Sequence, residues 1–256
     1  MEEEYKALIE NKTWTLIKRT DVPPGCQVLT GKWVYKVKTL LEPDSPELYK
    51  ACWVAKGFGQ QFVFDYFETF AAVAKPMSYK ILFALAAHYN LDIHQMDVKS
   101  AFLHRDLDEE IYLNLPNSFQ DGGEDVVCKL LKFLYDLKQA SHVWAKVLRE
   151  FLITYSLARL ESDHCIYVGK NLIVAIYVDD ILILSKNRRS LRQLKAELKN
   201  RFKMKDLGPV KHYLGIEVHR TKSWITLTQT EFITDLLKCF GMENCAPKLI
   251  FMNDKI

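Results

Sequence analysis

Residues 172–185 constrain the fold of this chain more than any other stretch, because two apolar, β-branched runs flank the adjacent carboxylates Asp179 and Asp180. Such runs are typical of strands buried on both faces, so they predict a hairpin in the core. Two-residue hairpin turns favour Asn-Gly or Asp-Gly, and Asp-Asp suits them poorly. Adjacent carboxylates on a buried hairpin also repel each other unless a cation lies between them. Two interpretations stay open: a divalent-metal site, or a solvated turn held by Asp side-chain hydrogen bonds.

Composition places the chain among globular proteins. It has 256 residues, 49% of them hydrophobic and 26% charged, which predicts a large core in one multi-lobed domain. Its six cysteines show no C-x-x-C spacing, so we expect no structural zinc and a reduced, intracellular and cytoplasmic setting. We find neither a signal-peptide pattern nor an apolar run near the ~20 residues that span a bilayer, so no membrane partner is expected.

Hydrophobic periodicity predicts strands and helices that interleave along the chain. Besides the central hairpin, strands are expected at residues 28–38, 48–56, 91–98, 126–131, 213–218 and 224–227. Helices are expected at residues 2–10, 78–90, 99–104, 140–155 and 190–202, and a last one between a Thr228–Glu231 capping box and Gly241. Ser78 is expected to cap the second helix. Short hairpins between these elements favour an α+β fold, an antiparallel sheet with helices on one face.

Positive charge is concentrated in residues 186–211, although the formal net charge of the chain is only +3. A basic helix of this kind is consistent with contact to a nucleic-acid backbone. The competing interpretation is a solvated face over a packed leucine stripe. The charged side chains of the segment are Lys186, Arg188, Arg189, Arg192, Lys195, Lys199, Arg201, Lys203, Lys205 and Lys211, against Glu197 and Asp206.

Asp97 is the natural third acidic residue of a site at the hairpin. It ends an alternating strand that places Ile93, Gln95 and Asp97 on one face. If this strand neighbours the hairpin, three carboxylates converge and can hold two Mg²⁺ ions about 3.5–4 Å apart, the arrangement used for in-line nucleotidyl transfer. The competing interpretation of a strand-end Asp is a structural cap or a surface residue.

A set of motifs, in order along the chain, resembles the reverse transcriptase of copia-type long-terminal-repeat retrotransposons. The two central motifs are residues 95–104, around Asp97, and the Tyr-Val-Asp-Asp sequence at 177–180. The others are residues 6–14, 31–36, 54–58, 68–70, 73–75, 134–140 with Trp144, 162–164, 204–208 and 213–218. Tyr-x-Asp-Asp alone is a weak signal, whereas the ordered set is specific.

The resemblance implies a right-hand polymerase fold with fingers, an antiparallel-sheet palm with a ferredoxin-like core, and a truncated thumb. It covers residues 1–246, and residues 247–256 match nothing. By position, the fingers are expected at about 1–90 and 126–155, and the palm at about 91–125 and 156–215. The primer-grip hairpin and the start of the thumb are expected at about 213–246.

The resemblance also implies the chemistry. Asp97, Asp179 and Asp180 match the family's catalytic, metal-binding carboxylates, which implies two Mg²⁺ ions, with Mn²⁺ as the alternative. The implied partners are an RNA or DNA template with its primer, and deoxynucleoside triphosphates. The implied reaction is RNA-directed DNA synthesis by a retrotransposon, ahead of DNA integration.

Further contacts follow from the same resemblance. Phe102 is expected under the incoming sugar, where it would clash with a 2′-OH; without that role, a Phe here is a core residue. The expected contacts with nucleotide or template phosphates are Lys36, Lys38, Lys50, Lys138 and Gln139, and those with the primer end are Tyr213, Leu214 and Gly215.

The chain departs from the family pattern at nucleotide-facing positions. Asp136 replaces a Gly, which adds a side chain and a negative charge close to where a triphosphate is expected. Ser141 and His142 replace Pro and Arg, and Cys52 replaces an Arg. Two hypotheses follow: an active RNA-directed DNA polymerase, or an inert, truncated remnant that at most binds nucleic acid. A palm-type nucleotide cyclase is disfavoured by the fingers and primer-grip motifs.

Overall fold

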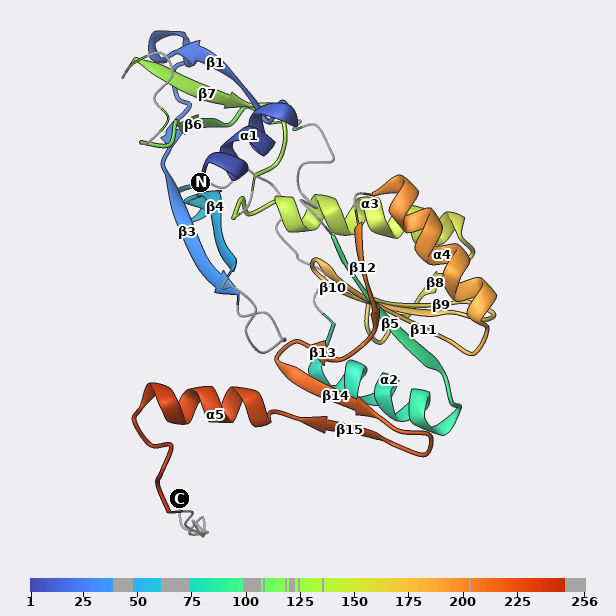
Figure 1. Cartoon of the computed structure of the whole chain (residues 1–256). Coiled ribbons are helices and arrows are strands. Elements are labelled where there is room, and N and C mark those ends of the chain that lie inside the picture. The colour runs from blue at the N-terminus through green and yellow to red at the C-terminus, as the bar shows by residue number, and fades with distance from the viewer. Residues whose placement is uncertain are drawn as a thin grey trace, which may run out of the picture.

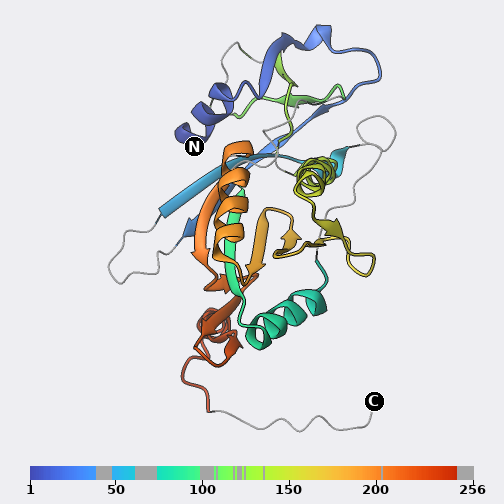
Figure 2. The same ribbon diagram turned by 90° about the vertical axis from the view of Figure 1, so that its right-hand side faces the viewer.

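The structure is a computed structural model that describes residues 1–38, 48–60, 74–98, 107, 109–117, 119, 123, 125–134, 136–202 and 204–246. Two lobes are visible in both views: a smaller sheet with the N-terminal helix above, and a larger sheet with its helices below (Figures 1 and 2). The helix expected at 99–104, with Phe102, and the tail at 247–256 lie outside the described residues. In the described part, every helix is too short or too polar to span a bilayer.

The lower lobe is built on a six-stranded sheet that contains the predicted hairpin. The hairpin is β10 (Ile173–Tyr177) with β11 (Asp180–Ser185), paired from Ile173–Leu184 to Tyr177–Asp180. All pairs in this sheet are antiparallel. Its other strands are β12 (Met204–Pro209), β5 (Asp92–Val98), β9 (Ile166–Val168) and β8 (Ala158–Arg159), in the order β12-β5-β11-β10-β9-β8.

Helices cover both faces of this sheet, so the expectation of one covered face is wrong. Along β11, Ile181 and Ile183 join one buried cluster, whereas Leu182 and Leu184 join another on the opposite face. Both faces of the hairpin are apolar, and each therefore needs a cover. The helices α3 (Ala140–Thr154) and α4 (Arg188–Arg201) supply one, and α2 (Pro76–His88) supplies the other.

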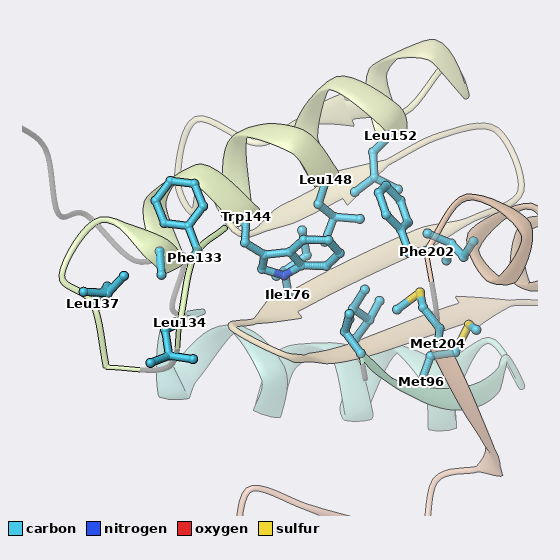
Figure 3. Packing of buried hydrophobic residues seen from close by; sticks show 14 of the residues in the cluster. Met96, Phe133, Leu134, Leu137, Trp144, Leu148, Leu152, Ile176, Phe202 and Met204 are labelled. Atoms are coloured by element: carbon cyan, nitrogen blue, oxygen red, sulfur yellow. The ribbon is translucent and has the colours of Figure 1, made fainter. Parts of the chain in front are cut away.

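Figure 3 shows how α3 is attached. Trp144, Leu148 and Leu152 point from the helix toward the strands, and α2 lies under the other side of the sheet. These three side chains are the buried face that the spacing of apolar residues in 140–155 predicted. Phe202, at the end of α4, packs edge-on against Trp144 with ring centroids 5.2 Å apart. The helix is therefore anchored directly above the central hairpin.

The upper lobe joins segments that lie far apart in the sequence. Its sheet has the order β1-β7-β6-β2, and β1 pairs antiparallel with β7 along its whole length. The ribbon of β3 and β4 extends from this lobe (Figure 1). The elements of the lobe are α1 (Glu2–Glu10), β1 (Trp14–Lys18), a 3₁₀ turn (Arg19–Asp21), β2 (Val28–Leu29), β3 (Gly31–Lys38), β4 (Leu48–Ala55), a second 3₁₀ turn (Gly57–Gly59), β6 (Tyr112–Asn114) and β7 (Val126–Leu130).

One buried cluster connects the two lobes. It runs from Leu8 of α1 and Trp14 of β1, through Leu113, to Ile176 of the central hairpin and Met204 of β12. The upper lobe therefore shares its core with the face of the large sheet that α3 and α4 cover.

The C-terminal part forms a third sheet and a last helix. The strands β13 (His212–Tyr213), β14 (Ile216–Arg220) and β15 (Ile225–Thr228) pair in that order, and the helix is α5 (Thr230–Cys239). The predicted hairpin is therefore present as β14 and β15, with β13 as a third strand. No side chain of α5 is buried, and the helix extends away from the body of the molecule (Figure 1).

Two predicted helix caps are replaced by distant partners. α2 begins at Pro76, so Ser78 lies inside it, and its hydroxyl donates to Asp163 Oδ2 at 2.5 Å. The capping box of Thr228 and Glu231 does not form, because α5 begins at Thr230 and Glu217 Oε1 accepts the backbone N–H of Glu231 at 2.8 Å. In both cases a carboxylate from elsewhere in the chain satisfies a donor in the first turn.

Removing the Asp163 carboxylate is expected to lower the free energy of unfolding by about 3 kcal/mol in Asp163→Ala. Asp163 is 6% exposed and accepts bonds from the Lys75 N–H at 2.9 Å, the Ser78 hydroxyl and the Cys165 N–H at 3.0 Å. Burial raises the pKa of Asp163, but the bonds from Ser78, Lys75 and Cys165 outweigh it and leave the pKa below its usual value.

The measurement is urea unfolding at pH 7, with Glu161→Ala on the exposed neighbouring surface as the control, expected to change stability by less than about 0.5 kcal/mol. A carboxyl with a depressed folded-state pKa stabilises above its unfolded pKa, and the contribution disappears as the pH falls through the folded value. The difference between wild type and Asp163→Ala should therefore shrink below about pH 4. Equal stabilities of the two variants at pH 7 would contradict this role.

Candidate active site

The central hairpin turns in a strained conformation. Tyr177 pairs with Asp180, so the two turn residues are Val178 and Asp179, and Asp180 is already the first residue of β11. The turn is therefore not an Asp-Asp turn. Val178 has φ +52°, a left-handed conformation that is an outlier for a β-branched side chain. Such strain persists only where the surroundings enforce it, and it is frequent at functional sites.

Two hydrogen bonds fix this turn from outside the hairpin. The indole Nε1 of buried Trp144 donates to the carbonyl oxygen of Val178 at 2.9 Å. The backbone N–H of Val98, at the end of β5, donates to the carbonyl oxygen of Asp179 at 3.2 Å. α3 and β5 thus hold the chain direction at both turn residues.

Asp97 lies beside the two hairpin carboxylates. β5 pairs antiparallel with β11, and the register places Asp97 opposite Asp180. On the same face of β5, Gln95 Nε2 donates to Asp180 Oδ1 at 2.9 Å. Residues more than 80 positions apart in the sequence therefore bring three carboxylates to one end of neighbouring strands.

The electrostatics of Asp179 reflect this crowding. Burial, and after it the charges of Asp97 and Asp180, raise the pKa of Asp179 to about 6, while the charge of Lys50 opposes them. Asp179 Oδ1 is buried and has no hydrogen-bond partner among the described residues. A buried, unpaired carboxylate oxygen close to two more carboxylates is costly, and a bound cation would relieve that cost.

The carboxylates fit a divalent cation by their chemistry, because Mg²⁺ prefers oxygen ligands and keeps water or phosphate in its other positions. In the part of the chain that the structure describes, no three His, Cys, Asp or Glu side chains are placed so that they could hold a metal ion as they stand. Ligation by all three carboxylates therefore requires their side chains to reorient.

The lysines expected near a triphosphate lie on the β3–β4 ribbon. Lys50 is exposed on β4, opposite Lys36 on β3, and its charge lowers the pKa of Asp179. The ribbon therefore places one cation within electrostatic reach of the carboxylates. Lys38 is the last residue of β3, and its side chain lies outside the described part.

Lys138 and Gln139 take part in a network that the sequence did not reveal. Buried Gln60 donates from Nε2 to Gln139 Oε1 at 3.0 Å and accepts the Lys138 N–H on Oε1 at 2.8 Å. Lys138 Nζ donates to the backbone carbonyl of Gln60 at 3.1 Å. Gln139 is itself only 2% exposed. These residues join the 3₁₀ turn after β4 to the start of α3, and their contact with a nucleotide stays a prediction.

Asp136 and Gly57 meet in the same region. Asp136 has φ +66°, a left-handed conformation that glycine adopts without strain and other residues rarely adopt. Its carbonyl oxygen lies so close to Gly57 that a Cβ on Gly57 would overlap it. The two backbones therefore touch directly, and only glycine fits at position 57.

Tyr213 lies beneath the site, while Leu214 and Gly215 form the turn that follows it. Tyr213 is 1% exposed and contacts Tyr79 and Phe83 of α2 edge-on, at centroid distances of 5.8 and 6.3 Å. Burial raises the pKa of Tyr213, and the charge of Asp180 adds to this. Leu214 and Gly215 have φ +51° and +76°. Tyr213 therefore supports the sheet under Asp180, and contact with a primer end stays a prediction.

Comparisons with known proteins give one consistent result. Residues 11–254 match the family described as reverse transcriptase (RNA-dependent DNA polymerase), a match that extends past Pro247. The chain is 38% identical over 256 residues to the retrovirus-related Pol polyprotein from transposon TNT 1-94 of Nicotiana tabacum, with 96% of this chain and 19% of that protein covered. It is 36% identical to the corresponding polyprotein from transposon RE1 of Arabidopsis thaliana, with 96% and 17% covered.

The chain therefore spans less than a fifth of the length of these relatives. Among solved structures, telomerase from Candida albicans, in complex with a TWJ fragment of telomeric RNA, aligns with a TM-score of 0.44 and 10% identity. That alignment covers 95% of this chain and 53% of the telomerase chain.

Proposed function

The chain belongs to the reverse transcriptase (RNA-dependent DNA polymerase) family, and on this premise we propose that it transfers deoxynucleotides to a primer 3′-OH on an RNA or DNA template. The observation that carries the proposal is the register of β5 on β11, which places Asp97 opposite Asp180 and next to buried Asp179. Three carboxylates at one sheet end are the donor set that in-line nucleotidyl transfer requires.

In this proposal Asp97, Asp179 and Asp180 would hold two Mg²⁺ ions, with Mn²⁺ as the alternative. The bound ions would supply charge for the attacking hydroxyl and the leaving pyrophosphate. Trp144 and Val98 hold the turn that carries Asp179, and Gln95 orients Asp180. Preorganised supports of this kind keep the carboxylates in place during the reaction.

The roles implied for the remaining residues are part of the proposal. Lys36, Lys38, Lys50, Lys138 and Gln139 would contact nucleotide or template phosphates. Phe102, in a segment that the structure does not describe, would select deoxyribose. Tyr213, Leu214 and Gly215 would position the primer end.

The proposal includes a right-hand architecture in which the antiparallel sheet would be a ferredoxin-like palm. The upper lobe with its β3–β4 ribbon corresponds to the fingers, and the segment from β13 to α5 to the primer grip and the start of a thumb. The expected boundaries assigned α2 and α3 to the fingers. Because both helices pack on the large sheet, we propose that they belong to the palm.

The test is primer extension with deoxynucleoside triphosphates on an RNA template, with and without Mg²⁺. Wild-type chain should incorporate nucleotides only with the metal, and Asp97→Asn, which removes one charge with almost no change in volume, should not. Incorporation that survives in Asp97→Asn would refute the assignment. Template binding without incorporation by wild-type chain would favour the alternative, an inert remnant.

Asp136 is the observation that favours the alternative, and replacing it is expected to raise incorporation. Asp136→Gly removes a side chain from a left-handed position and a negative charge near the proposed triphosphate site. Like charges a few ångströms apart cost about 1–4 kcal/mol near a protein surface, so we expect a gain of at least about fivefold in incorporation at limiting nucleotide concentration.

Asp136→Asn is the matched control, because asparagine keeps the volume and tolerates the left-handed conformation but carries no charge. If the negative charge of Asp136 is the obstacle, both variants should incorporate nucleotides faster than wild type. If the volume of its side chain is the obstacle, only Asp136→Gly should do so. Initial rates at several nucleotide concentrations separate the two. Equal rates for all three chains would show that Asp136 is not what limits this protein.

A further inference from the structure

A cationic surface lies at the end of the central hairpin that is away from the carboxylates. Here β11 ends at Ser185 and β10 begins at Ile173, whereas Asp180 is at the opposite end of β11. Five residue steps along β11 correspond to about 17 Å. The surface is therefore separate from the proposed active site.

An open depression of about 920 Å³ forms at this end, and a neighbouring one of about 790 Å³ shares Lys186 and Arg188 with it. Their walls carry six cationic side chains and one carboxylate, that of Asp92. The cations are Lys170, Lys186, Arg188, Arg189, Arg220 and Lys222. Six cations and one carboxylate give a local net charge of +5, against a formal net charge of +3 for the entire chain, so positive charge is concentrated here.

Most of this charge is not neutralised locally. Arg188 pairs with Asp92 at 2.9 Å, and Arg220 donates to Asn90 Oδ1 at 2.8 Å and to the Leu91 carbonyl. The remaining cations of the two depressions have no carboxylate partner within ion-pair distance in the described parts of the chain; they are Lys170, Lys186, Arg189 and Lys222.

The cations of α4 therefore differ in whether they have a carboxylate partner. Further along α4, Lys195 and Lys199 both face Asp206, at 2.6 and 3.6 Å. These two lysines hold α4 to β12 and are used structurally. The unpaired cations Lys186 and Arg189, by contrast, lie just before and at the start of the helix and line the depression.

The larger depression has apolar side chains at its floor and an aromatic ring beside them. Leu91, Leu172, Ile173 and Leu184 line it, and Tyr89, at the C-terminal cap of α2, is 57% exposed beside them. An exposed aromatic side chain among cations is the arrangement by which proteins stack a nucleobase while they hold its phosphates.

Hydrogen bonds connect the segments that form the rim of the depression. The Ser185 hydroxyl donates to the carbonyl oxygen of Asn171 at 2.5 Å and ties the 169–172 turn to the end of β11. Asn187 Oδ1 accepts the N–H groups of Arg189 and Ser190 at 2.9 and 3.2 Å. Because Asn187 occupies these amides of α4, the side chains and not the helix end supply the attraction for an anion.

We propose that this surface, Tyr89 with Lys170, Lys186 and Arg189, binds single-stranded nucleic acid at a site distinct from the proposed polymerase site. The charges attract the phosphate backbone of any nucleic acid, but the apolar floor and Tyr89 can be used only by an unpaired base. A duplex hides its bases and would use the charges alone. The occupant is therefore a single strand.

The first test is the salt dependence of binding of a fluorescein-labelled oligothymidylate, measured by anisotropy on the whole chain. In Lys170→Gln/Lys186→Gln/Arg189→Gln the slope of log Kd against log salt should fall by about 2, at ~0.7 per cation for single strands. Tyr89→Ala should weaken binding about fivefold or more with an unchanged slope. The matched control, Lys80→Gln/Lys146→Gln/Arg149→Gln, removes three exposed cations elsewhere and should change little.

The second test locates the strand. An oligonucleotide with 4-thiothymidine, cross-linked by ultraviolet light and mapped by peptide mass, should label peptides that contain Tyr89 or Lys170, and should do so equally in Asp179→Asn. Equal labelling in Asp179→Asn would show that this surface binds nucleic acid without an intact polymerase site. The proposed surface and the proposed polymerase activity can therefore fail independently. Cross-links confined to other peptides, or equal loss of binding in the two triple variants, would overturn the inference.

Discussion

Asp179→Asn is expected to abolish nucleotide incorporation and at the same time to make the chain more stable at pH 8 without metal. The loss of activity should reach about 10³-fold or more, because a metal-held charge supplies several kcal/mol of transition-state stabilisation. The gain in stability has a separate cause. Burial, together with the charges of Asp97 and Asp180, raises the pKa of Asp179 to about 6. Ionising this group therefore costs free energy in the folded chain.

The direction in which pH changes the stability follows from the raised pKa of Asp179. An unfolded Asp ionises near pH 3.9, whereas this one ionises near pH 6 in the folded chain. Between these values the folded state binds more protons, so rising pH destabilises it, and the cost is complete above about pH 6. Two pKa units correspond to about 2–3 kcal/mol. Asparagine carries no charge, so the gain at pH 8 should approach that figure and should shrink as the pH falls toward 4.

Urea unfolding in a chelator, at several pH values, measures this effect. Asp125→Asn, an exposed carboxylate on the upper lobe, is the control and should change stability by less than about 0.5 kcal/mol. Adding Mg²⁺ should raise the Tm of wild type and have little effect on Asp179→Asn. A variant that is less stable than wild type at pH 8 would show that Asp179 is satisfied by protein groups.

Gly57→Ala is expected to destabilise the chain by about 3 kcal/mol, a large effect for one methyl group. The new Cβ would overlap the carbonyl oxygen of Asp136 and approach Gln60 Oε1 to 3.3 Å. Backbone cannot move aside as the end of a side chain can. The contact joins the 3₁₀ turn to the segment before α3, so the Gln60–Gln139 hydrogen bond should be lost with it.

Gly59→Ala is the matched control in the same 3₁₀ turn. Its Cβ would meet only Leu29 Cδ2, at 3.6 Å, which is ordinary van der Waals contact. Thermal and urea unfolding of the two variants should differ by about 2 kcal/mol or more. Equal stabilities would indicate that the Gly57–Asp136 approach relaxes freely, and that the link between the lobes does not depend on it.

The sequence predicted those parts of the fold that depend on local apolar pattern. The runs around Asp179 and Asp180 predicted a buried hairpin, and the structure confirms it. The spacing of Trp144, Leu148 and Leu152 predicted the buried face of α3. In these segments the period of the side chains alone decides which of them are buried.

What escaped prediction depends on residues that meet only in the folded chain. No local rule pairs Asp163 with the start of α2, or Gln60 with Gln139, because isolated polar residues carry no periodic signal. The left-handed conformation of Val178 runs against the preference of valine and arises because Trp144 and Val98 hold the turn. The approach of Asp97 to the hairpin depended on strand order, which the residues alone left open.

The buried cluster that runs from Leu8 to Met204 has a mechanical consequence. Two lobes that share one core cannot swing apart as rigid bodies without exposing that core to water. The β3–β4 ribbon differs, because its side chains Tyr35 and Tyr49 are 67% and 74% exposed. Bending of the ribbon would therefore expose less buried apolar surface than a rotation of one lobe against the other.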